Sequence, residues 1–259
     1  MTGHLAAGSA QRGPRPGGGW TPVVATLALV AAFVSAVVGA GPAQAVVGGS
    51  TASTGTWSVR VYEDDEPICT GVLVDRRWVL TAGHCVRFDN SDITFRVGNL
   101  DQREGEVVPR LPGRTFFAAN ADVALVQIPE VTTRPIRLPA VGSRQDRDLP
   151  VRTRLSVFGW GATCEPDEAT CQSDRLRTAS VRIIAGTETR CDYLAGTEDY
   201  CVSRGTGLPV GGDSGGPATI DGPCGPLLAG ILAASDRTDT AAYANVHRLR
   251  PWITATIGR

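Results

Sequence analysis

The chain has 259 residues, of which 42% are apolar and 20% charged, and its formal net charge is −1. This length accommodates one large domain or two small ones. No basic surplus argues for binding to nucleic acid or to an anionic membrane, and we expect neither partner.

The first 45 residues predict a secretory signal peptide. They contain no acidic residue, and their only two bases precede an apolar run at 20–40. A small-x-small cleavage motif, "AQA", follows at 43–45. The run is also just long enough to span a bilayer, so an uncleaved membrane anchor is the alternative. Cleavage predicts a secreted, extracellular chain that begins at Val46 and no longer contacts the membrane.

The remaining chain predicts an all-β structure made of short strands. Turn signals such as "DN", "PG" and "DGP" separate short β-branched or apolar runs, a pattern typical of a barrel or a sandwich. A linker-like stretch at 138–150 divides the chain into an N-terminal domain, 46–140, and a C-terminal domain, 141–259. The expected strands are 58–62, 70–74, 93–97, 123–128, 154–160, 181–184 and 227–233.

The C-terminal stretch 247–257 alone shows helical spacing. Its apolar residues recur so that Leu249, Trp252 and Ile253 fall on one face. Pro251 is expected near the helix start, where a missing N–H costs nothing.

Seven cysteines predict disulfides rather than a zinc site. No C-x-x-C pair occurs, and an exported chain meets an oxidising compartment. The odd count leaves at least one cysteine unpaired. The cysteines are at 69, 85, 164, 171, 191, 201 and 224.

Three residues carry the candidate chemistry. His84, in "VLTAGHC", follows an apolar strand, and taken alone it is best explained as a buried structural histidine. Asp122, in "NADVALVQI", starts a strand that looks fully buried, and a buried carboxylate needs a partner. Ser214 lies in "GGDSGGPA" among glycines. A serine hydroxyl attacks only if an imidazole takes its proton and a carboxylate orients that imidazole.

These motifs resemble those of the chymotrypsin/trypsin-like serine proteases. "VLTAGHC", "NADVALVQI" and "GGDSGGP" match the family's His, Asp and Ser motifs in the family's order. "VVGG" at the new N-terminus, "GWG" at 159–161 and "PWI" near the end also match. The chain looks like a bacterial member of the family, and the resemblance covers essentially all of 46–259.

The resemblance implies a fold and a set of roles. It implies two six-stranded antiparallel Greek-key barrels with the active site between them and a C-terminal helix. His84 acts as general base and then general acid, Asp122 orients it, and Ser214 attacks the scissile carbonyl. The N–H groups of Gly212 and Ser214 form the oxyanion hole, where the glycine-rich backbone leaves room for an oxyanion. The implied function is that of a serine endopeptidase.

The resemblance also implies structural partners. The free amine of Val46 is expected to pair with Asp213, and signal cleavage itself would expose that amine because no propeptide intervenes. Cys69–Cys85 and Cys191–Cys201 match family disulfides. Proximity alone suggests the third bridge, Cys164–Cys171. Cys224 is left over, either as a buried inert thiol or as half of an intermolecular bridge.

The specificity pocket departs from the family pattern. In trypsins an Asp six residues before the nucleophile selects Arg or Lys, but Leu208 stands here. The usual pocket disulfide is absent, so the pocket frame is rebuilt. We expect an apolar floor that accepts small or medium P1 side chains; the alternative is that Asp236 or Asp239 restores a cation preference. The other expected pocket residues are Pro209, Val210, Ala233, Ala234 and Ser235.

Two other classes of function remain open at this point. A chain with this fold can be a non-catalytic binding module, although such proteins usually lose a triad member. Asp101, Glu104 and Glu106 could bind Ca²⁺, although a solvated acidic loop explains them better. We expect no metal and no cofactor, and a monomer that acts on protein or peptide substrates.

Overall fold

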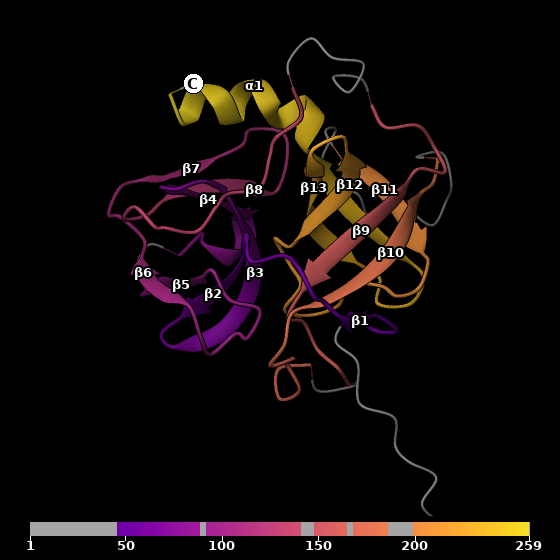
Figure 1. The fold of residues 1–259 in the computed structure, drawn as a ribbon, viewed down its shortest axis with the longest axis horizontal. Coiled ribbons are helices and arrows are strands. Elements are labelled where there is room, and N and C mark those ends of the chain that lie inside the picture. Colours follow the sequence, from indigo (N-terminus) through magenta and orange to yellow (C-terminus); the bar gives the residue numbers. More distant parts are fainter. Residues whose placement is uncertain (1–45, 89–91, 141–147, 165–167, 186–198, 259) are drawn as a thin grey trace, which may run out of the picture. The chain divides into compact units, whose positions relative to one another are not determined.

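In the part of the chain that the structure describes, the apolar segments form two antiparallel sheets of seven strands each, followed by one α-helix (Figure 1). The described residues belong to one compact unit, and none of their helices is long and apolar enough to cross a membrane. The predicted signal segment, 1–45, lies outside them. The computed structural model describes residues 46–88, 92–140, 148–164, 168–185 and 199–258.

The first sheet has the order β6-β5-β2-β3-β4-β8-β7. One segment supplies both edge strands, because it turns at 111–114 and pairs with β5 before the turn and with β8 after it. This bent segment closes the sheet into a barrel and makes the strand number seven instead of six. The strands are β2 (Ser58–Glu63), β3 (Glu66–Asp75), β4 (Trp78–Ala82), β5 (Ile93–Val97), β6 (Glu106–Pro109), β7 (Thr115–Phe117) and β8 (Val123–Gln127).

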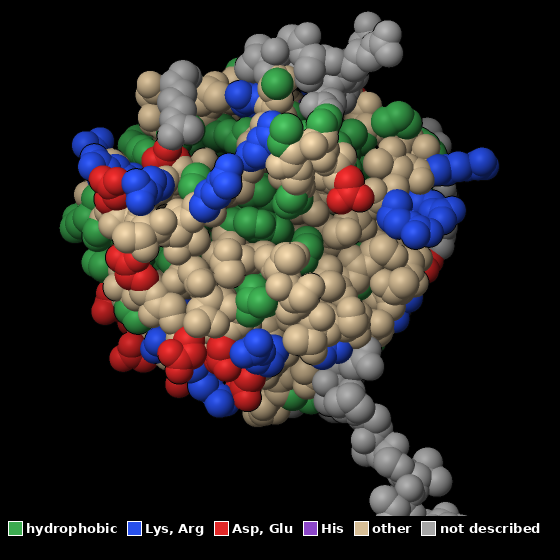
Figure 2. Space-filling view, in the orientation of Figure 1, with side chains coloured by type: hydrophobic (Ala, Val, Ile, Leu, Met, Phe, Trp, Pro, Cys, Tyr) green, Lys and Arg blue, Asp and Glu red, His purple; other side chains and the backbone are tan. Residues whose placement is uncertain are grey.

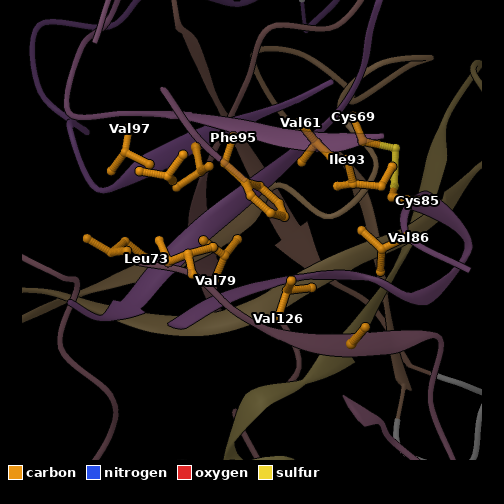
Figure 3. Packing of buried hydrophobic residues seen from close by; sticks show 14 of the residues in the cluster. Val61, Cys69, Leu73, Val79, Cys85, Val86, Ile93, Phe95, Val97 and Val126 are labelled. Carbon is orange, nitrogen blue, oxygen red and sulfur yellow. A yellow bond between two sulfur atoms is a disulfide. The ribbon is translucent and has the colours of Figure 1, made fainter. Parts of the chain in front are cut away.

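Alternating side chains fill the first barrel. Val59 and Val61 of β2 pack against Phe95 and other apolar residues, all of them buried (Figure 3). The Cys69–Cys85 disulfide lies at the edge of this cluster. Because side chains alternate along a strand, the residue between the two valines, Arg60, leaves the barrel core and faces the other way.

The second sheet has the order β1-β10-β11-β14-β13-β12-β9. Strand β9 pairs with both β12 and β10, which closes the ring, and the two-residue β1 extends the edge of β10. The barrel therefore holds six strands and one short addition, as the sequence predicted. The strands are β1 (Ser50–Thr51), β9 (Arg154–Gly159), β10 (Arg177–Ile183), β11 (Asp199–Arg204), β12 (Pro217–Gly222), β13 (Gly225–Ser235) and β14 (Thr240–Asn245).

The helix α1 (Val246–Thr256) begins where the sequence predicted a helix. The Asn245 side chain caps it by accepting the main-chain N–H of His247 at 3.0 Å. Leu249 and Ile253 pack on an apolar cluster drawn from both barrels. Pro251 lies inside the helix rather than at its start, because the cap is six residues earlier than the proline.

The cysteines are distributed as follows. Disulfides join Cys69 to Cys85 and Cys164 to Cys171. Cys201 is also disulfide-bonded, and its predicted partner, Cys191, lies outside the described residues. Cys224 is a free thiol and is exposed, so the expectation of a buried thiol was wrong. It lies in the turn between β12 and β13, outside the strands that carry the core.

On one face of the molecule, charges of both signs are interspersed along an edge. Figure 2 shows acidic and basic side chains intermixed along the lower left edge of the face it displays. This pattern agrees with the near-balanced formal charge of the chain.

Candidate active site

The position of His84 is set by the end of strand β4. The buried strand ends at Ala82, and a single 3₁₀ turn, Gly83–Cys85, carries the histidine. The Gly83 N–H donates to the Asp122 carbonyl at 3.0 Å, and Cys85 is tied to Cys69. The His84 side chain is 41% exposed, so its ring faces solvent from a rigid base.

Asp122 lies directly before β8 and reaches His84 with both carboxylate oxygens. Its Oδ2 lies 2.5 Å from the His84 Nδ1, and its Oδ1 accepts the His84 main-chain N–H at 3.0 Å. A side chain at Gly83 would place a Cβ 2.7 Å from Oδ1, so glycine is required for this approach.

The charge of Asp122 is maintained by its neighbours. Partial burial would raise the pKa of the Asp122 carboxyl, but the hydrogen bonds and charge of His84, with Arg87, outweigh burial and hold the pKa below its ordinary value. The carboxylate therefore stays ionised where it can orient an imidazole and stabilise its charged form.

Ser214 lies in a tight turn between the two barrels. Its carbonyl accepts the Thr70 N–H at 2.9 Å, and the next residue, Gly215, donates to the Leu232 carbonyl at 2.8 Å. Gly212 and Gly215 have φ values of +90° and +79°, which only glycine adopts at low cost. Strand β12 starts immediately after the turn at Pro217, so the quoted glycine-rich motif ends in a core strand.

A cavity of about 200 Å³ contains both His84 and Ser214, which come from different barrels. The lining thus places the imidazole and the hydroxyl in one cleft. Its other lining residues are Val210, Gly211, Leu232, Ala233, Ala234, Ser235 and Arg237.

The predicted pocket residues divide into two groups. Val210 and the 233–235 segment line the cavity, whereas Leu208 and Pro209 do not line it. Leu208 is fully buried in the core of the second barrel, where its N–H pairs with the Val47 carbonyl at 3.0 Å. Leu208 was assigned to the pocket floor because it lies six residues before Ser214. This spacing does not reveal that its side chain points into the core instead.

The acidic residues proposed to restore a cation preference do not line this cavity either. The Asp236 carboxylate accepts the main-chain N–H groups of Thr238, Asp239 and Thr240, together with the Thr240 hydroxyl. These hydrogen bonds outweigh partial burial and lower the pKa of Asp236. Its charge is therefore engaged within its own turn.

Asp213 is buried to 1% exposure beside Ser214. Its two oxygens accept the N–H of Gly161 at 2.7 Å and of Val210 at 3.0 Å. Burial raises the pKa of Asp213 to about 6, although these hydrogen bonds and the charge of Arg60 oppose the rise. Val46 is fully buried in the same barrel. In the uncleaved chain its nitrogen is a peptide nitrogen, so the predicted ion pair requires cleavage before Val46.

Four polar residues near the site were not identified from the sequence. Arg60 and Gln172 contact the glycines before Ser214, and Glu168 pairs with Arg237 at 2.8 Å. The one signal available was Arg60, a charge at the centre of the apolar strand "SVRVY". The other three lie in loops whose sequences carry no periodic pattern.

The potential metal ligands near the site are sulfurs of a disulfide. Cys69, His84 and Cys85 offer ligand atoms within 4.8 Å of one another, but the two sulfurs are bonded together and offer no thiolate. At the acidic loop, Asp101 accepts the Arg103 N–H at 3.0 Å. Among the described residues, Asp101, Glu104 and Glu106 do not gather into a group that could hold an ion.

Similar proteins share both sequence and fold with this chain. A family model described as Trypsin matches residues 46–253. "Serine protease 56" from Mus musculus is 34% identical over 248 residues, covering 80% of this chain and 38% of that protein. "Trypsin 5G1" from Aedes aegypti is 30% identical over 209 residues, covering 73% of this chain and 75% of that protein.

A human relative and a solved structure extend the comparison. "Kallikrein-8" from Homo sapiens is 30% identical over 222 residues, covering 78% of this chain and 82% of that protein. The structure of mouse-brain neuropsin superposes with a TM-score of 0.67 at 22% identity, covering 81% of this chain and 98% of that one, which confirms the fold. The chain spans only 38% of the length of the mouse and human proteins named serine protease 56.

Proposed function

Because this chain belongs to the trypsin family, we propose that it is a secreted serine endopeptidase that hydrolyses peptide bonds through Ser214, His84 and Asp122. The observation that carries this proposal is the 2.5 Å contact between His84 Nδ1 and Asp122 Oδ2, beside a cavity that His84 shares with Ser214. A carboxylate on Nδ1 keeps the proton there and leaves the other ring nitrogen free to accept one.

The reaction proceeds in two steps. The Ser214 hydroxyl oxygen bonds to the scissile carbonyl carbon while His84 takes the hydroxyl proton. His84 then gives this proton to the amine as the C–N bond breaks, and an acyl-enzyme remains. A water molecule attacks the ester in the same way, passing its proton to His84 and then to the Ser214 oxygen. Asp122 stabilises the imidazolium at each stage.

Two main-chain N–H groups, those of Gly212 and Ser214, are proposed to bind the oxyanion. The negative charge that develops on the carbonyl oxygen is stabilised best by donors that are already oriented. Asp213, between these residues, is proposed to receive the Val46 ammonium after signal cleavage. This ion pair would satisfy a carboxylate whose pKa burial otherwise raises to about 6.

The proposed P1 preference is for small or medium apolar side chains. The cavity wall offers Val210, Leu232, Ala233 and Ala234, and among its described lining residues the only Arg, Lys, Asp or Glu is the cation Arg237. A cation at the rim disfavours Arg and Lys at P1. This supports the apolar pocket over the alternative in which Asp236 attracts a cation. A bacterial origin stays a prediction from sequence.

A fluorophosphonate probe tests the proposed function. The protein cleaved before Val46 should be labelled once, at Ser214, with fluoride released as the serine oxygen bonds to phosphorus. Ser214→Ala should remain unlabelled and lose several orders of magnitude in kcat with unchanged unfolding behaviour. A folded wild-type protein that is not labelled and hydrolyses no peptide would instead be a binding module.

A further inference from the structure

Arg60 is a fully buried arginine at the centre of strand β2. The flanking residues, Val59 and Val61, fill the first barrel, and Arg60 leaves that core for the second barrel. Its guanidinium reaches the carbonyl of Gly212, 152 residues later in the chain, at 2.9 Å. A charge with no exposure persists in a strand only if its hydrogen bonds are satisfied.

The five N–H groups of Arg60 match five acceptors. Nε donates to Gln102 Oε1 at 3.0 Å, and Nη1 donates to the carbonyls of Cys69 and Gly212 at 3.1 and 2.9 Å. Nη2 donates to the Pro67 carbonyl at 3.3 Å and to Gln172 Oε1 at 2.8 Å. All five acceptors are uncharged. Burial lowers the pKa of Arg60 to about 10, opposed by Tyr62 and Asp213, so the group stays charged at neutral pH.

Two of these bonds hold the peptide groups on either side of the Gly212 Cα, one directly through the Gly212 carbonyl and one through Gln172 to the Gly211 carbonyl. The Gly212 carbonyl accepts from both Arg60 and the Thr70 hydroxyl, each at 2.9 Å. The Gly211 carbonyl accepts the Ala162 N–H at 2.8 Å and the Gln172 amide at 3.3 Å. That glutamine is itself held by Arg60.

Because a peptide group is planar, fixing the Gly211 carbonyl also fixes the direction of the Gly212 N–H. In a trans peptide the C=O of one residue and the N–H of the next point in opposite directions. Holding the Gly211 carbonyl against Ala162 and Gln172 therefore directs the Gly212 N–H away from them. Two successive glycines would otherwise allow this peptide to rotate, because neither has a Cβ to limit it.

We propose that Arg60 is a positioning residue for the oxyanion hole, which it holds open from the opposite barrel through the Gly212 carbonyl and through Gln172. This inference rests on the proposed protease function. Arg60 touches neither the substrate nor the reacting atoms, and we infer that it acts on catalysis through the two peptide groups that flank the Gly212 Cα. It therefore acts on the transition state, where the oxyanion forms, more than on the bound substrate.

The test compares Arg60→Met with a matched control, Tyr62→Phe, in the protease cleaved before Val46. Tyr62 lies on the same strand, and its hydroxyl donates to the Gln102 carbonyl at 2.7 Å, so the control also removes a buried hydrogen bond at this interface. It leaves Gly211 and Gly212 untouched. Arg60→Met should lower kcat on a peptide substrate at least tenfold with KM within twofold, and Tyr62→Phe should leave both within twofold.

The ratio of the affinities of two inhibitors provides a second measurement. This ratio would not change if Arg60 only stabilised the fold. A peptide aldehyde accepts the Ser214 oxygen at its carbonyl carbon and develops an oxyanion, whereas the matching peptide alcohol occupies the same subsites without one. The wild-type preference for aldehyde over alcohol should fall in Arg60→Met by about the factor lost in kcat. Arg60→Lys, which keeps the charge but has fewer donors, should recover part of it.

The outcomes separate the two proposals. An active wild type whose aldehyde preference is unchanged in folded Arg60→Met overturns the role of Arg60 alone. A loss carried by KM, or shared equally by aldehyde and alcohol, also overturns it. A wild type that neither hydrolyses peptides nor reacts with the fluorophosphonate overturns both. If Arg60→Met does not fold, Gln172→Ala decides: it should lower kcat severalfold at constant KM, and wild-type kcat would refute the proposal.

Discussion

Asp122 holds His84 at two points, with Oδ2 on the ring Nδ1 at 2.5 Å and Oδ1 on the main-chain N–H at 3.0 Å. The second contact fixes the turn, and the first fixes which ring nitrogen bears the proton. One carboxylate therefore serves both the fold and the chemistry.

Asp122→Asn should separate these two roles. An asparagine can keep its oxygen on the main-chain N–H, but its amide then faces Nδ1 and forces the imidazole proton onto the nitrogen that must accept from Ser214. We expect kcat to fall about 10⁴-fold. Thermal unfolding should change little, and a kcat within tenfold of wild type would refute the assignment.

Asp213 predicts an unusual pH dependence of stability in the uncleaved chain. Burial raises its folded pKa to about 6, above the unfolded value of about 3.9. The contribution of Asp213 to the free energy of unfolding is then fully present below pH 4 and is lost as the pH rises through 6. A shift of this size corresponds to roughly 3 kcal/mol.

The measurement is urea unfolding from pH 4 to 7 in a Ser214→Ala chain that retains the residues before Val46. Adding Asp213→Asn should make the free energy of unfolding nearly independent of pH over this range. The comparison is between the slopes of the free energy against pH in the two chains, not between their absolute stabilities. Cleavage before Val46 should also remove the loss, because the ammonium then pairs with the carboxylate. Parallel curves for the chains with and without Asp213→Asn would contradict the pKa argument.

Arg237 should shape P1 selectivity. It lines the cavity and pairs with Glu168 at 2.8 Å. Arg237→Ala removes a cation and frees a carboxylate, so kcat/KM for Arg at P1 relative to Ala or Leu should rise about 3- to 10-fold. Arg77→Ala is the matched control, since Arg77 is as exposed and pairs with Glu130 at 2.7 Å away from the cavity lining. Equal selectivity in both variants would exclude Arg237 from specificity.

The Val46 amine offers a single-atom test of the N-terminal ion pair. The sequence contains no lysine, so after cleavage this amine is the only primary amine in the chain. Because Val46 is fully buried, the amine should resist acylation in the native protein and react under mild denaturation. The acylated group cannot carry the charge that Asp213 needs, and losing one partner of a buried pair costs about 3–5 kcal/mol.

Mass spectrometry should find one adduct on Val46, and the refolded adduct should be inactive while a mock-treated sample recovers. Hydrolysis by the adduct at the mock-treated rate would show that the ion pair does not organise this site.

Features encoded in a short stretch of sequence were easier to predict than features that depend on contacts between distant residues. His84, Asp122 and Ser214 could be proposed as the reacting groups because each lies in a motif a few residues long. The helix was located from its apolar spacing, but its start depended on Asn245, and Pro251 was placed wrongly for that reason. His247, in the first turn of this helix, is only 5% exposed although it lies in a polar stretch of the sequence.

Other features depend on contacts between residues distant in the sequence. Arg60 meets Gln172 and Gly212, which are 112 and 152 residues away from it. Leu208 joins a core cluster that also contains Val46, which lies far from it in the sequence. No pattern near either residue encodes these partners, so the sequence could propose the reacting groups but not the contacts around them.

The turn that carries Ser214 is bonded to a strand made after it. Gly215 and Gly216 exchange main-chain hydrogen bonds with Leu232 at 2.8 and 2.9 Å, and β13, which contains Leu232, is in turn paired with β14. A ribosome therefore synthesises the nucleophile before it synthesises the support that shapes it. The serine therefore leaves the ribosome before the strand that shapes its turn, and the turn can reach its final form only after β13 has been synthesised and paired.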